Sequence, residues 1–600
     1  MIDVLIVAFH ADIAQFRGLL DALCVAKRAG VPIAVRVWHN DGNVPTSGAT
    51  FELYEQTREA GLQVHVGGGE GNLGFGSGIN RMMSDAQAPF VLVLNQDAIP
   101  EPGALAELWS TASSADATVA AWEMRQIPFE HPKVYDPVTQ YTEWVSGAAL
   151  LLRTSVMREV GGFEPRIFMY GEDVDLSWRL RCAGYQLRYV PRAAVVHHTY
   201  SVANEVKPLQ ALEGIYVNLC LRTRYAGHRQ IATGLSMAIG EMMMPQSFPG
   251  RRIGIARAVL KFFRNYFYFV RSRKSAPHFE PRFAGWGYEL RRDGAFHRFL
   301  PQSEQPEILP LVSVLVRTHK RGGFLRQALT TVALQTHRPI EVVVVEDGSE
   351  EGRAVCEEFA GRLEIAYYQL IPAAGRSVAG NLALSKARGE WLCFLDDDDV
   401  FFADHLEVLL QAVREHKLKG AYALAWRTMT RIQDASVPTY DEISWDRMPD
   451  EPFSRVAMWH HNYMPIQSVL FHRSLYDTYG GFEEDMEQLE DWNLWTRYTM
   501  RDDFVQLRKT TSKYRVPADS ANNAQRQGKL DEAYRDAVAR QAKMTFDADP
   551  IFVRKLAEDY ARSNALIHVG RDMVRSRVAS TPWLARIVSW RHLFRRRMGG

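Results

Sequence analysis

The sequence lacks an excess of charge and has few cysteines, and both absences exclude classes of protein. Its 71 lysines and arginines stand against 70 aspartates and glutamates, so the net charge is +1. This balance argues against a dedicated nucleic-acid-binding protein, and we expect no nucleic acid among its partners. The cysteines are Cys24, Cys182, Cys220, Cys356 and Cys393, an odd set with no C-x-x-C pair. We therefore expect neither a disulfide framework nor a zinc site, and we expect a reducing compartment.

We also expect neither a membrane span nor a leader sequence. No stretch reaches the ~18 uncharged apolar residues that a membrane span needs. The best candidate, residues 253–270, contains Arg257, Lys261 and Arg264. The apolar run that follows Met1 carries Asp3 and has no basic segment before it, unlike a secretory signal. We expect a cytoplasmic protein whose membrane contact, where it has one, is peripheral and at the inner face of the cytoplasmic membrane.

The chain does contain one sequence pattern that occurs twice. Its 600 residues are too many for a single hydrophobic core. Five blocks recur in the same order about three hundred residues apart, a period that indicates two homologous domains rather than a solenoid. The paired blocks are VLIVAFH (4–10) with VSVLVRTH (312–319), VWHNDG (37–42) with VVVEDG (343–348), GINRMMSDAQAPFVLVLNQD (78–97) with AGNLALSKARGEWLCFLDDD (379–398), LLLRTSVMREVGGFE (150–164) with LFHRSLYDTYGGFE (470–483), and GEDVDLSWRL (171–180) with LEDWNLWTRY (489–498).

Each copy alternates apolar strands with helical stretches such as 13–29 and 323–335. The strands are β-branched runs without polar alternation, as expected for parallel strands buried on both faces. This predicts an α/β fold with two tandem, doubly wound, mostly parallel sheets of Rossmann-like type. Ligands on such sheets bind beyond the carboxyl ends of the strands. Polar residues stand there in both copies, at Asp41, Asn95 to Asp97, Asp347 and Asp396 to Asp399.

The amino-acid composition changes between the two copies and again after the second, and these changes divide the chain into four regions. Residues 206–275 are expected to be helical and end in a segment with eight Lys/Arg and no acid, and the C-terminus places Trp583 and Phe594 on one helical face opposite Arg595 to Arg597. Basic, aromatic helices of this kind predict contact with an anionic lipid surface, with a merely solvated face as the alternative. The regions are a first domain at 1–205, a helical and basic linker region at 206–310, a second domain at 311–530, and a helical, Arg-rich extension at 531–600.

Four consecutive carboxylates, Asp396 to Asp399, mark a candidate metal site. Like charges at one strand end raise one another's pKa unless a cation neutralises them. Oxygen ligands at an open site suit Mg²⁺ or Mn²⁺, which can bridge substrate phosphates and offset the charge that develops on a leaving diphosphate. The alternative is a helix N-cap, in which Asp398 or Asp399 caps a helix that begins near Asp404.

A second acidic motif, Glu-Asp after GGF-E, also recurs. Asp173 and Asp491 each follow a glutamate and precede a helix-like run, so we expect both at helix starts that face the strand ends. A carboxylate in such a place can accept the proton of a hydroxyl group as its oxygen attacks a substrate. The alternative is an acidic first turn that complements the helix dipole.

Together these motifs resemble the inverting family 2 glycosyltransferases of the GT-A fold, over roughly residues 1–205 and 311–520. The N-terminal copy is similar to the rhamnosyltransferase branch, through GNLGFGSGIN, LVLNQDA, VSGAALLLR and GGFEPRIFMYGEDVDLSWRLRCAGYQL. The resemblance implies that Asp173 and Asp491 are catalytic bases, and that Asp398 in one copy and Asp97 and His197 in the other hold Mn²⁺ or Mg²⁺. Donor-binding residues implied by it are Asp41, Asn95, Asp347 and Asp396.

The sequence departs from the family pattern at several of these positions. Asn95 leaves one carboxylate, Asp97, at the N-terminal metal position, where His197 or the neighbouring His198 would add an imidazole or be structural. The C-terminal copy has no histidine downstream of its base and carries Pro517 near that place. The Gly-rich segment 67–78 does not follow the first strand with dinucleotide-binding spacing. We expect it to form a loop over the donor that leads into a helix near Asn80.

The function that this pattern favours is a bifunctional inverting glycosyltransferase with one linkage per domain. Its donors would be UDP-, dTDP- or GDP-sugars, and its acceptor an oligosaccharide or lipid-linked glycan of a growing bacterial surface polysaccharide such as O-antigen or capsule. One alternative is an active C-terminal domain with an N-terminal copy that only binds glycan. Another is a sugar-nucleotide nucleotidyltransferase, although both first strands lack the Gly-rich, basic loop that such enzymes need.

Overall fold

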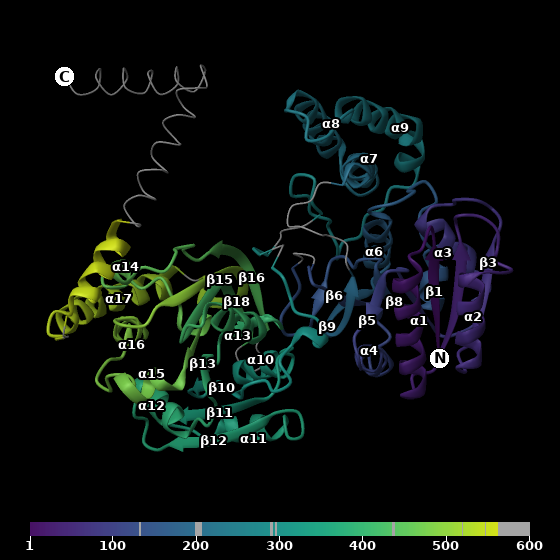
Figure 1. Ribbon diagram of the computed structural model, residues 1–600. Helices are drawn as coiled ribbons and strands as arrows, with labels where there is room; N and C mark the ends of the chain where they lie inside the picture. Colours follow the sequence, from purple (N-terminus) through teal and green to yellow (C-terminus); the bar gives the residue numbers. More distant parts are fainter. Residues whose placement is uncertain are drawn as a thin grey trace, which may run out of the picture.

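The structure, a computed structural model, describes residues 1–130, 134–197, 207–288, 292–294, 297–434, 439–518, 520–545 and 548–561. These form two α/β domains joined by a helical region (Figure 1). The expected C-terminal helical face from Trp583 to Phe594 lies outside the described residues, as does His198.

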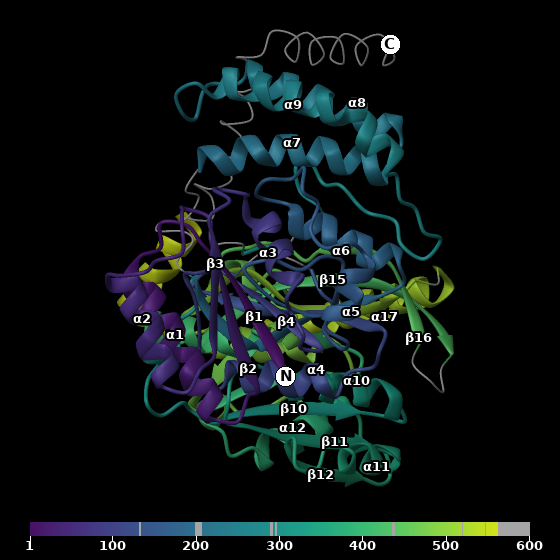
Figure 2. The same ribbon diagram turned by 90° about the vertical axis from the view of Figure 1, so that its right-hand side faces the viewer.

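The first domain is built on a nine-stranded sheet with helices on both sides of it (Figure 2). Its strands are β1 (Ile2–Ala8), β2 (Ile33–His39), β3 (Val64–Gly68), β4 (Phe90–Leu94), β5 (Ala98–Pro100), β6 (Val119–Ile127), β7 (Tyr141–Thr142), β8 (Ala149–Arg153) and β9 (Gln186–His197). Its helices are α1 (Ile13–Arg28), α2 (Ala49–Glu59), α3 (Phe75–Met83), α4 (Ala104–Ser113), α5 (Thr154–Glu159) and α6 (Glu172–Cys182). Helix α3 begins at Phe75, so the helix expected near Asn80 starts five residues earlier.

The second domain repeats this arrangement. Its strands are β10 (Val312–Thr318), β11 (Ile340–Asp347), β12 (Glu364–Leu370), β13 (Trp391–Phe394), β14 (Val400–Phe401), β15 (Gly420–Asp434), β16 (Thr439–Arg447), β17 (Val469–His472) and β18 (Phe504–Pro517). Its helices are α10 (Gly322–Ala333), α11 (Glu351–Glu357), α12 (Arg376–Lys386), α13 (His405–His416), α14 (Arg455–Met458), α15 (Arg473–Tyr479), α16 (Glu490–Tyr498) and α17 (Ser520–Gln541).

The strand order confirms that the sequence is duplicated. The first sheet runs β3-β2-β1-β4-β8-β6-β9-β5, and the second runs β12-β11-β10-β13-β17-β15-β18-β14. Each number in one order has its counterpart in the other, and β1, β2, β3 and β4 pair in parallel as β10, β11, β12 and β13 do where their registers are given. The predicted class, two tandem doubly wound sheets of mostly parallel strands, is confirmed.

The helices form where the sequence supplies both a cap and an apolar stripe. In α1 the side chain of Asp12 accepts a hydrogen bond from the backbone N–H of Gln15 at 2.9 Å. Phe16, Leu19 and Leu23 then recur at helical spacing and are buried against the sheet.

The region between the two domains contains α7 (Pro208–Tyr225), α8 (His228–Met243) and α9 (Arg251–Arg271), followed by an irregular stretch with the short 3-10 helix η1 (Gln302–Glu304). Helix α7 packs on the first domain through a buried ionic contact. Arg224 donates to Asp175 of α6 and to Glu164, both at 2.6 Å. Figure 2 shows α7 above the first sheet and α8 and α9 above α7, and the three helices together are called the helical layer below.

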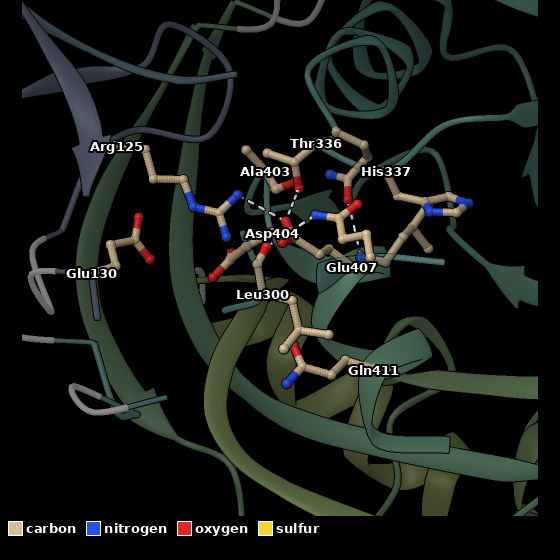
Figure 3. Close-up of polar contacts among 12 residues, drawn as sticks. Arg125, Glu130, Leu300, Thr336, His337, Ala403, Asp404, Glu407 and Gln411 are labelled. Carbon is tan, nitrogen blue, oxygen red and sulfur yellow. Dashed lines mark hydrogen bonds and ion pairs between the residues drawn. The ribbon is translucent and has the colours of Figure 1, made fainter. Parts of the chain in front are cut away.

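The two domains meet along a buried polar network. Arg125 on β6 donates to Glu407 on α13 at 2.8 Å, and the same carboxylate accepts from Thr336 (Figure 3). Arg292 of the linker region lies between Glu130 of the first domain and Asp404 of the second, at 3.3 and 3.0 Å.

Lys509 and aromatic side chains complete this interface. The Lys509 ammonium lies 3.5 Å from Glu130 and 3.3 Å from Asp404, so both carboxylates are shared between two cations. Tyr135 packs edge-on against Phe402, and its hydroxyl accepts from the backbone N–H of Ala403 at 3.0 Å. Breaking buried ion pairs is costly, so the interface fixes the two domains against each other.

Candidate active sites

The recurring GGF-E motif is clasped by an asparagine in both domains. Asn80 donates to the carbonyl of Phe163 and accepts from its N–H, both at 2.8 Å. Asn381 makes the same pair with Phe482, at 3.0 and 2.7 Å. A Cβ on Gly162 would lie 2.3 Å from Asn80 Oδ1, so this position requires glycine.

An arginine of the following helix completes each clasp. Arg179 of α6 donates to the carbonyls of Val160 and Gly162, both at 2.6 Å. Arg497 of α16 donates to the carbonyls of Tyr479 and Gly481. The clasps therefore hold the start of α6 and of α16, where the Glu-Asp motif stands.

Asp173 lies in the first turn of α6, as predicted, and its carboxylate faces the end of the sheet. Its Oδ2 accepts from the N–H of Gly147 at 2.9 Å, and its Oδ1 accepts from Val174 at 2.8 Å. The next residue, Ala148, accepts through its carbonyl from the N–H of Asn95 at 2.9 Å. Two adjacent residues thus join the Glu-Asp motif to the Asn-Gln-Asp motif at the end of β4.

The neighbouring Glu172 is buried, and its Oε2 has no hydrogen-bond partner. Burial and the negative charge of Asp173 raise the pKa of Glu172 to about 8. Glu172 is therefore largely protonated at neutral pH, which leaves Asp173 the carboxylate of the pair available as a base.

Asp97 and His197 lie together at the carboxyl edge of the first sheet, with His197 Nε2 3.4 Å from Asp97 Oδ1. His197 Nδ1 lies 2.8 Å from Gln126 Oε1, and the Gln126 amide nitrogen donates to Ser146 at 3.1 Å. Because Gln126 presents its oxygen, the imidazole carries a proton on Nδ1, and Nε2 is the ring nitrogen turned toward Asp97. Burial alone would raise the pKa of Asp97, but His197 lowers it below its ordinary value.

Asn95 and Asp41 stand at the same edge. Asn95 Nδ2 is 3.5 Å from His197 Nε2. Asp41 follows β2 and accepts from the N–H of His10 at 2.9 Å, with His39 Nδ1 at 3.2 Å from its other oxygen. The four predicted metal and donor residues of the first domain therefore all lie at or just beyond the ends of β2, β4 and β9.

The second domain surrounds its acidic motif with arginines. Arg317 of β10 donates two bonds to Asp396, both at 2.8 Å, and a third to Glu490 at 2.9 Å. Burial alone would raise the pKa of Asp396, but the Arg317 guanidinium lowers it below its usual range. Asp396 and the Glu-Asp motif, separated by more than ninety residues in sequence, are thus bridged by one side chain.

Asp398 is the more exposed member of the cluster, with 40% of its side chain accessible. Arg321 lies 2.9 Å from Asp398 and 3.2 Å from Asp397. Burial, together with the charge of Asp398, raises the pKa of Asp397 to about 7. Asp399 is buried and accepts from the N–H of Arg515 at 3.0 Å, and its pKa is raised by burial and by the charges of Asp398 and Asp396.

The helix-cap interpretation of this cluster is wrong. Helix α13 begins at His405, Asp404 occupies its cap position, and strand β14 (Val400–Phe401) separates that helix from Asp398 and Asp399. Asp399 instead binds β18, and Asp398 projects beside Arg321 at the open strand end.

Asp491 lies in the first turn of α16, as predicted. Its Oδ2 accepts from Asn462 and its Oδ1 from the N–H of Trp492, at 2.9 and 2.8 Å. Burial and the charge of Glu490 raise the pKa of Asp491 to about 7. A carboxylate with this pKa changes its charge near neutral pH, which suits a general base.

Asp347 ends β11 and closes the loop before α12. Its two oxygens accept from the N–H groups of Ala374 and Gly375, at 2.6 and 3.0 Å. The structure therefore places Asp347 at the same sheet edge as Asp396, with its carboxylate engaged by backbone donors.

The strand registers identify the counterpart of His197 in the second domain. In the first sheet Ala98 pairs with His197. In the second sheet Val400 stands one place after the counterpart of Ala98 and pairs with Lys513. The place of the histidine is therefore one residue further along β18, at Tyr514. The residue in the place of Gln126 is Ala425, since Gln126 pairs with Val195 and Ala425 with Ser512. Pro517, expected near that place, lies three residues further along β18.

The two sites differ in the side chains that they offer to a divalent cation. Asp97 and His197, with the imidazole oriented by Gln126, form a carboxylate–imidazole pair, a donor set that fits such an ion. In the second domain Asp398 supplies a carboxylate but has no imidazole beside it. Within the described ranges, no group of three or more His, Cys, Asp or Glu side chains is placed so that it could hold a metal ion.

Sequence reasoning missed the arginines and asparagines that position these carboxylates. Arg317 and Arg321 are absent from the first domain, where Val7 and Ala11 stand, so no repeat marks them. Asn80 with Asn381, and Arg179 with Arg497, do recur at matching places in the paired blocks, and that recurrence was the available signal.

Comparison with protein families agrees with this geometry. The model described as "Glycosyl transferase family 2" matches residues 313–479, and that described as "Glycosyl transferase family group 2" matches residues 115–268. The chain belongs to the family 2 glycosyltransferases. The second match runs from the first domain through α7 and α8 into α9, so the helical layer is part of what this family model describes.

Individual relatives of this glycosyltransferase are similar over parts of its length. An N-acetylglucosaminyl-diphospho-decaprenol L-rhamnosyltransferase of Mycobacterium tuberculosis is 34% identical over 172 residues, covering 21% of this chain and 56% of the relative. An uncharacterized glycosyltransferase of Rickettsia bellii is 27% identical over 212 residues, covering 35% of this chain and 29% of the relative. The chain thus spans less than two thirds of the length of either relative.

Solved structures resemble the chain more weakly. S. aureus TarS 1–349 in complex with UDP-GlcNAc has a TM-score of 0.32 and 18% identity, covering 42% of this chain and 71% of that one. The mannosyltransferase PcManGT from Pyrobaculum calidifontis, in complex with GDP-Man and Mn²⁺, has a TM-score of 0.29 and 15% identity, covering 45% and 83%.

Proposed function

We propose that the protein is a bifunctional inverting glycosyltransferase that forms one linkage in each domain of a growing bacterial surface polysaccharide. The observation that carries the proposal is the repeated placement of a carboxylate, Asp173 or Asp491, in a clasped helix start beside the strand-end acidic motif. Its donors would be nucleotide sugars carrying UDP, dTDP or GDP.

The proposed chemistry assigns one task to each group. Asp173 or Asp491 accepts the proton of the acceptor hydroxyl as that oxygen attacks the anomeric carbon, and the nucleoside diphosphate leaves from the opposite face. A bound Mn²⁺ or Mg²⁺ would neutralise the charge that develops on the diphosphate. Asp97 and His197 would hold it in the first domain, and Asp398 in the second. Asp41, Asn95, Asp347 and Asp396 would orient the donor.

The helical layer supports an acceptor at a membrane surface. Exposed apolar side chains lie along α9 at Ile253, Leu260, Phe263 and Phe267, with 61, 52, 52 and 71% of their surfaces accessible. Their spacing puts them on one helical face, among the exposed Arg252, Arg257 and Arg264. An apolar face rimmed by arginines fits an anionic lipid surface.

The position of this layer adds to the proposal. Arg224 attaches α7 to α6, the helix that carries Asp173, so a lipid-bound acceptor would lie near the first domain's proposed base. The mycobacterial relative is named for a decaprenol-linked acceptor, which agrees with this reading. Among the described helices, none is long and apolar enough to cross a membrane.

A second candidate function is an active C-terminal domain with an N-terminal copy that only binds glycan. The observation that favours it is Asn95 in place of a carboxylate, where the second domain has Asp396 paired with Arg317. The intact Asp97–His197 pair favours two active sites instead.

One experiment separates these candidates. Replacing Asp173 or Asp491 by asparagine keeps the size of the side chain but removes the proton acceptor, which costs about 10²–10⁴ in rate at that site. With a panel of UDP-, dTDP- and GDP-sugars, Asp173→Asn should abolish one linkage and Asp491→Asn the other, as read from product mass and linkage analysis. If the Asp173→Asn variant still forms every linkage, the alternative of an N-terminal copy that only binds glycan is established.

Metal dependence of the second domain is tested separately. Transfer by that domain should stop in excess EDTA and return with Mn²⁺ or Mg²⁺, and Asp398→Ala should remove it. Undiminished transfer in EDTA, or full activity of Asp398→Ala, would show that Asp398 holds no metal.

A further inference from the structure

A pocket of about 240 Å³ lies where both domains and the linker region meet. The first domain lines it with the segment from Val134 to Glu143 and with Arg181 at the end of α6. The second domain contributes Trp445 of β16 and Lys513 of β18, and the linker region contributes Arg282. None of these residues is a proposed catalytic, donor or metal residue.

Two polar atoms of the pocket residues have no protein partner. Glu143 Oε2 and Arg181 Nε are each buried without a hydrogen bond. Buried polar groups are rarely left unpaired, because the loss of their hydration costs about 1–3 kcal/mol each. One carboxylate oxygen that can accept and one guanidinium N–H that can donate, each without a protein partner beside one pocket, fit a ligand that carries hydroxyl groups, since a hydroxyl does both.

The rest of the lining narrows the ligand class. The acidic residues Asp136, Glu143 and Glu442 are matched by Arg181, Arg282 and Lys513, so the pocket has no excess of charge for a phosphate or a metal ion. Lys513 is already paired with Glu442, at 2.8 and 2.9 Å.

Aromatic rings supply the apolar part. Trp445 stacks on the buried Trp426 with centroids 5.5 Å apart and ring planes 3° from parallel, which holds its indole rigidly. Tyr135 and Tyr141 lie in the opposite domain's part of the lining. Rigid aromatic faces beside paired polar groups suit a sugar ring, which has an apolar C–H face and a polar edge. The volume, below the ~300 Å³ of pockets for drug-sized ligands, suits one or two sugar units.

The pocket lies beside the second domain's proposed site. Lys513 and Arg515 are two residues apart on β18, so their side chains share a face and lie roughly 7 Å apart. Arg515 binds Asp399 through its backbone and lies close enough to Asp136 of the pocket for their charges to interact. On the other side, Arg181 is eight residues from Asp173 on α6, or about 12 Å along the helix.

We propose that this interdomain pocket binds one or two sugar units of the glycan acceptor and holds the chain next to the second domain's site. The proposal rests on the proposed glycosyltransferase function for the identity of the chain, but the pocket binds sugar without donor or metal. Its position between the two domains makes the acceptor subsite common to both: the product of one domain stays bound while the other domain acts.

Binding without donor tests the pocket directly. The full-length protein is applied to an array of defined di- to tetrasaccharides, and the tightest ligand is measured by titration calorimetry. Glu143→Ala and Trp445→Ala should each weaken binding by about tenfold or more, as expected for the loss of a hydrogen bond to a charged group or of a stacking face. Trp445→Phe should keep most of the affinity, because it keeps an aromatic face.

Controls separate this result from instability and from failure of the proposed function. Glu358→Ala removes a half-exposed glutamate that pairs with Arg326 outside the pocket, and it should bind like the wild type. Nucleotide release from donor sugars without acceptor measures the glycosyltransferase activity alone and should be unchanged in the pocket variants. Absence of glycan binding by the wild type, or equal binding by Glu143→Ala and Trp445→Ala, would overturn the pocket proposal even where donor turnover is present.

Discussion

His197 Nε2 lies 3.4 Å from Asp97 Oδ1 across the edge of the first sheet. The two residues are one hundred positions apart in sequence, and strands β5 and β9 bring them together because Ala98 pairs with His197. Gln126 on β6 fixes the imidazole so that its Nε2 faces the carboxylate. The second domain has Tyr514 and Ala425 at these places, so the two sites differ in how they would hold a cation.

This difference predicts unequal metal affinity. Gln126→Leu should weaken Mn²⁺ binding at the first domain by about 10–100-fold, since outer-shell partners of a ligating histidine contribute that much. His197→Ala should weaken it at least as far. The measurement is calorimetric titration of Mn²⁺ into the full chain. Gln56→Leu, at a glutamine on α2 away from either site, is the matched control, and equal Mn²⁺ affinity in all three variants would remove His197 from the metal site.

Much of this architecture was predictable from the sequence, because the duplication made weak local patterns reinforce one another. The two doubly wound sheets followed from the paired blocks, and Asp173 and Asp491 lie at helix starts as the recurring Glu-Asp motif indicated. A repeat reports only what the two copies share, however. Arg317 bridges Asp396 and Glu490 in one copy alone, where the other has Val7, so sequence comparison gave it no weight.

The interface between the domains was not predictable for a related reason. Arg125 reaches Glu407 across 282 residues, and Arg292 comes from an irregular linker with no periodic pattern. Neither residue belongs to a repeated block. Only the packing of the two domains shows that these charges are buried together.

The raised pKa of Asp491 predicts the pH dependence of the second domain. A carboxylate acts as a base only when it is ionised, so kcat/KM for that linkage should fall as pH decreases through about 7, tenfold per unit below it. The charge of Glu490 contributes to the raised pKa, so Glu490→Gln should move this acid limb to lower pH. Profiles of kcat/KM against pH, measured for each linkage with its own donor, check this. A limb at the ordinary carboxyl pKa in the wild type would contradict the burial of Asp491.

The interdomain network predicts a large effect for a residue far from either site. Arg292→Met leaves Glu130 and Asp404, both buried, with Lys509 as their remaining shared cation, and should lower the free energy of unfolding by about 3–5 kcal/mol. Urea denaturation followed by circular dichroism measures the change.

A surface arginine of the same region provides the control. Arg298 pairs with Glu304 at 2.9 Å with about half of each side chain exposed, so Arg298→Met should change stability by less than about 1 kcal/mol. Similar losses in both variants would mean that burial of the network does not stabilise the interface. Limited proteolysis should also cut the linker of Arg292→Met faster, because the two domains would separate more often.

The exposed face of α9 predicts that the protein binds anionic membranes. Replacing both Phe263 and Phe267 by alanine removes two exposed aromatic anchors, and replacing Arg257 and Arg264 by glutamine removes two cations worth about 1 kcal/mol each near an anionic surface. The arginine variant should therefore bind phosphatidylglycerol vesicles roughly thirtyfold more weakly. It should be far less affected on neutral phosphatidylcholine vesicles, and added salt should weaken the wild type in the same way.

Sedimentation with vesicles of the two compositions measures this binding. A control variant outside α9 shows whether the effect belongs to the exposed face of that helix. Ile308→Ala changes a side chain that is 85% exposed in the linker, outside α8 and α9, and should bind like the wild type.

Removing residues 581–600 tests the second basic segment by itself, and we expect it to reduce vesicle binding further without loss of either domain's fold. If the phenylalanine and arginine variants bind vesicles as tightly as the wild type, the face of α9 is not the membrane contact. If the truncated chain also binds unchanged, the basic segments are solvated and the acceptor must reach Asp173 without a lipid surface beside it.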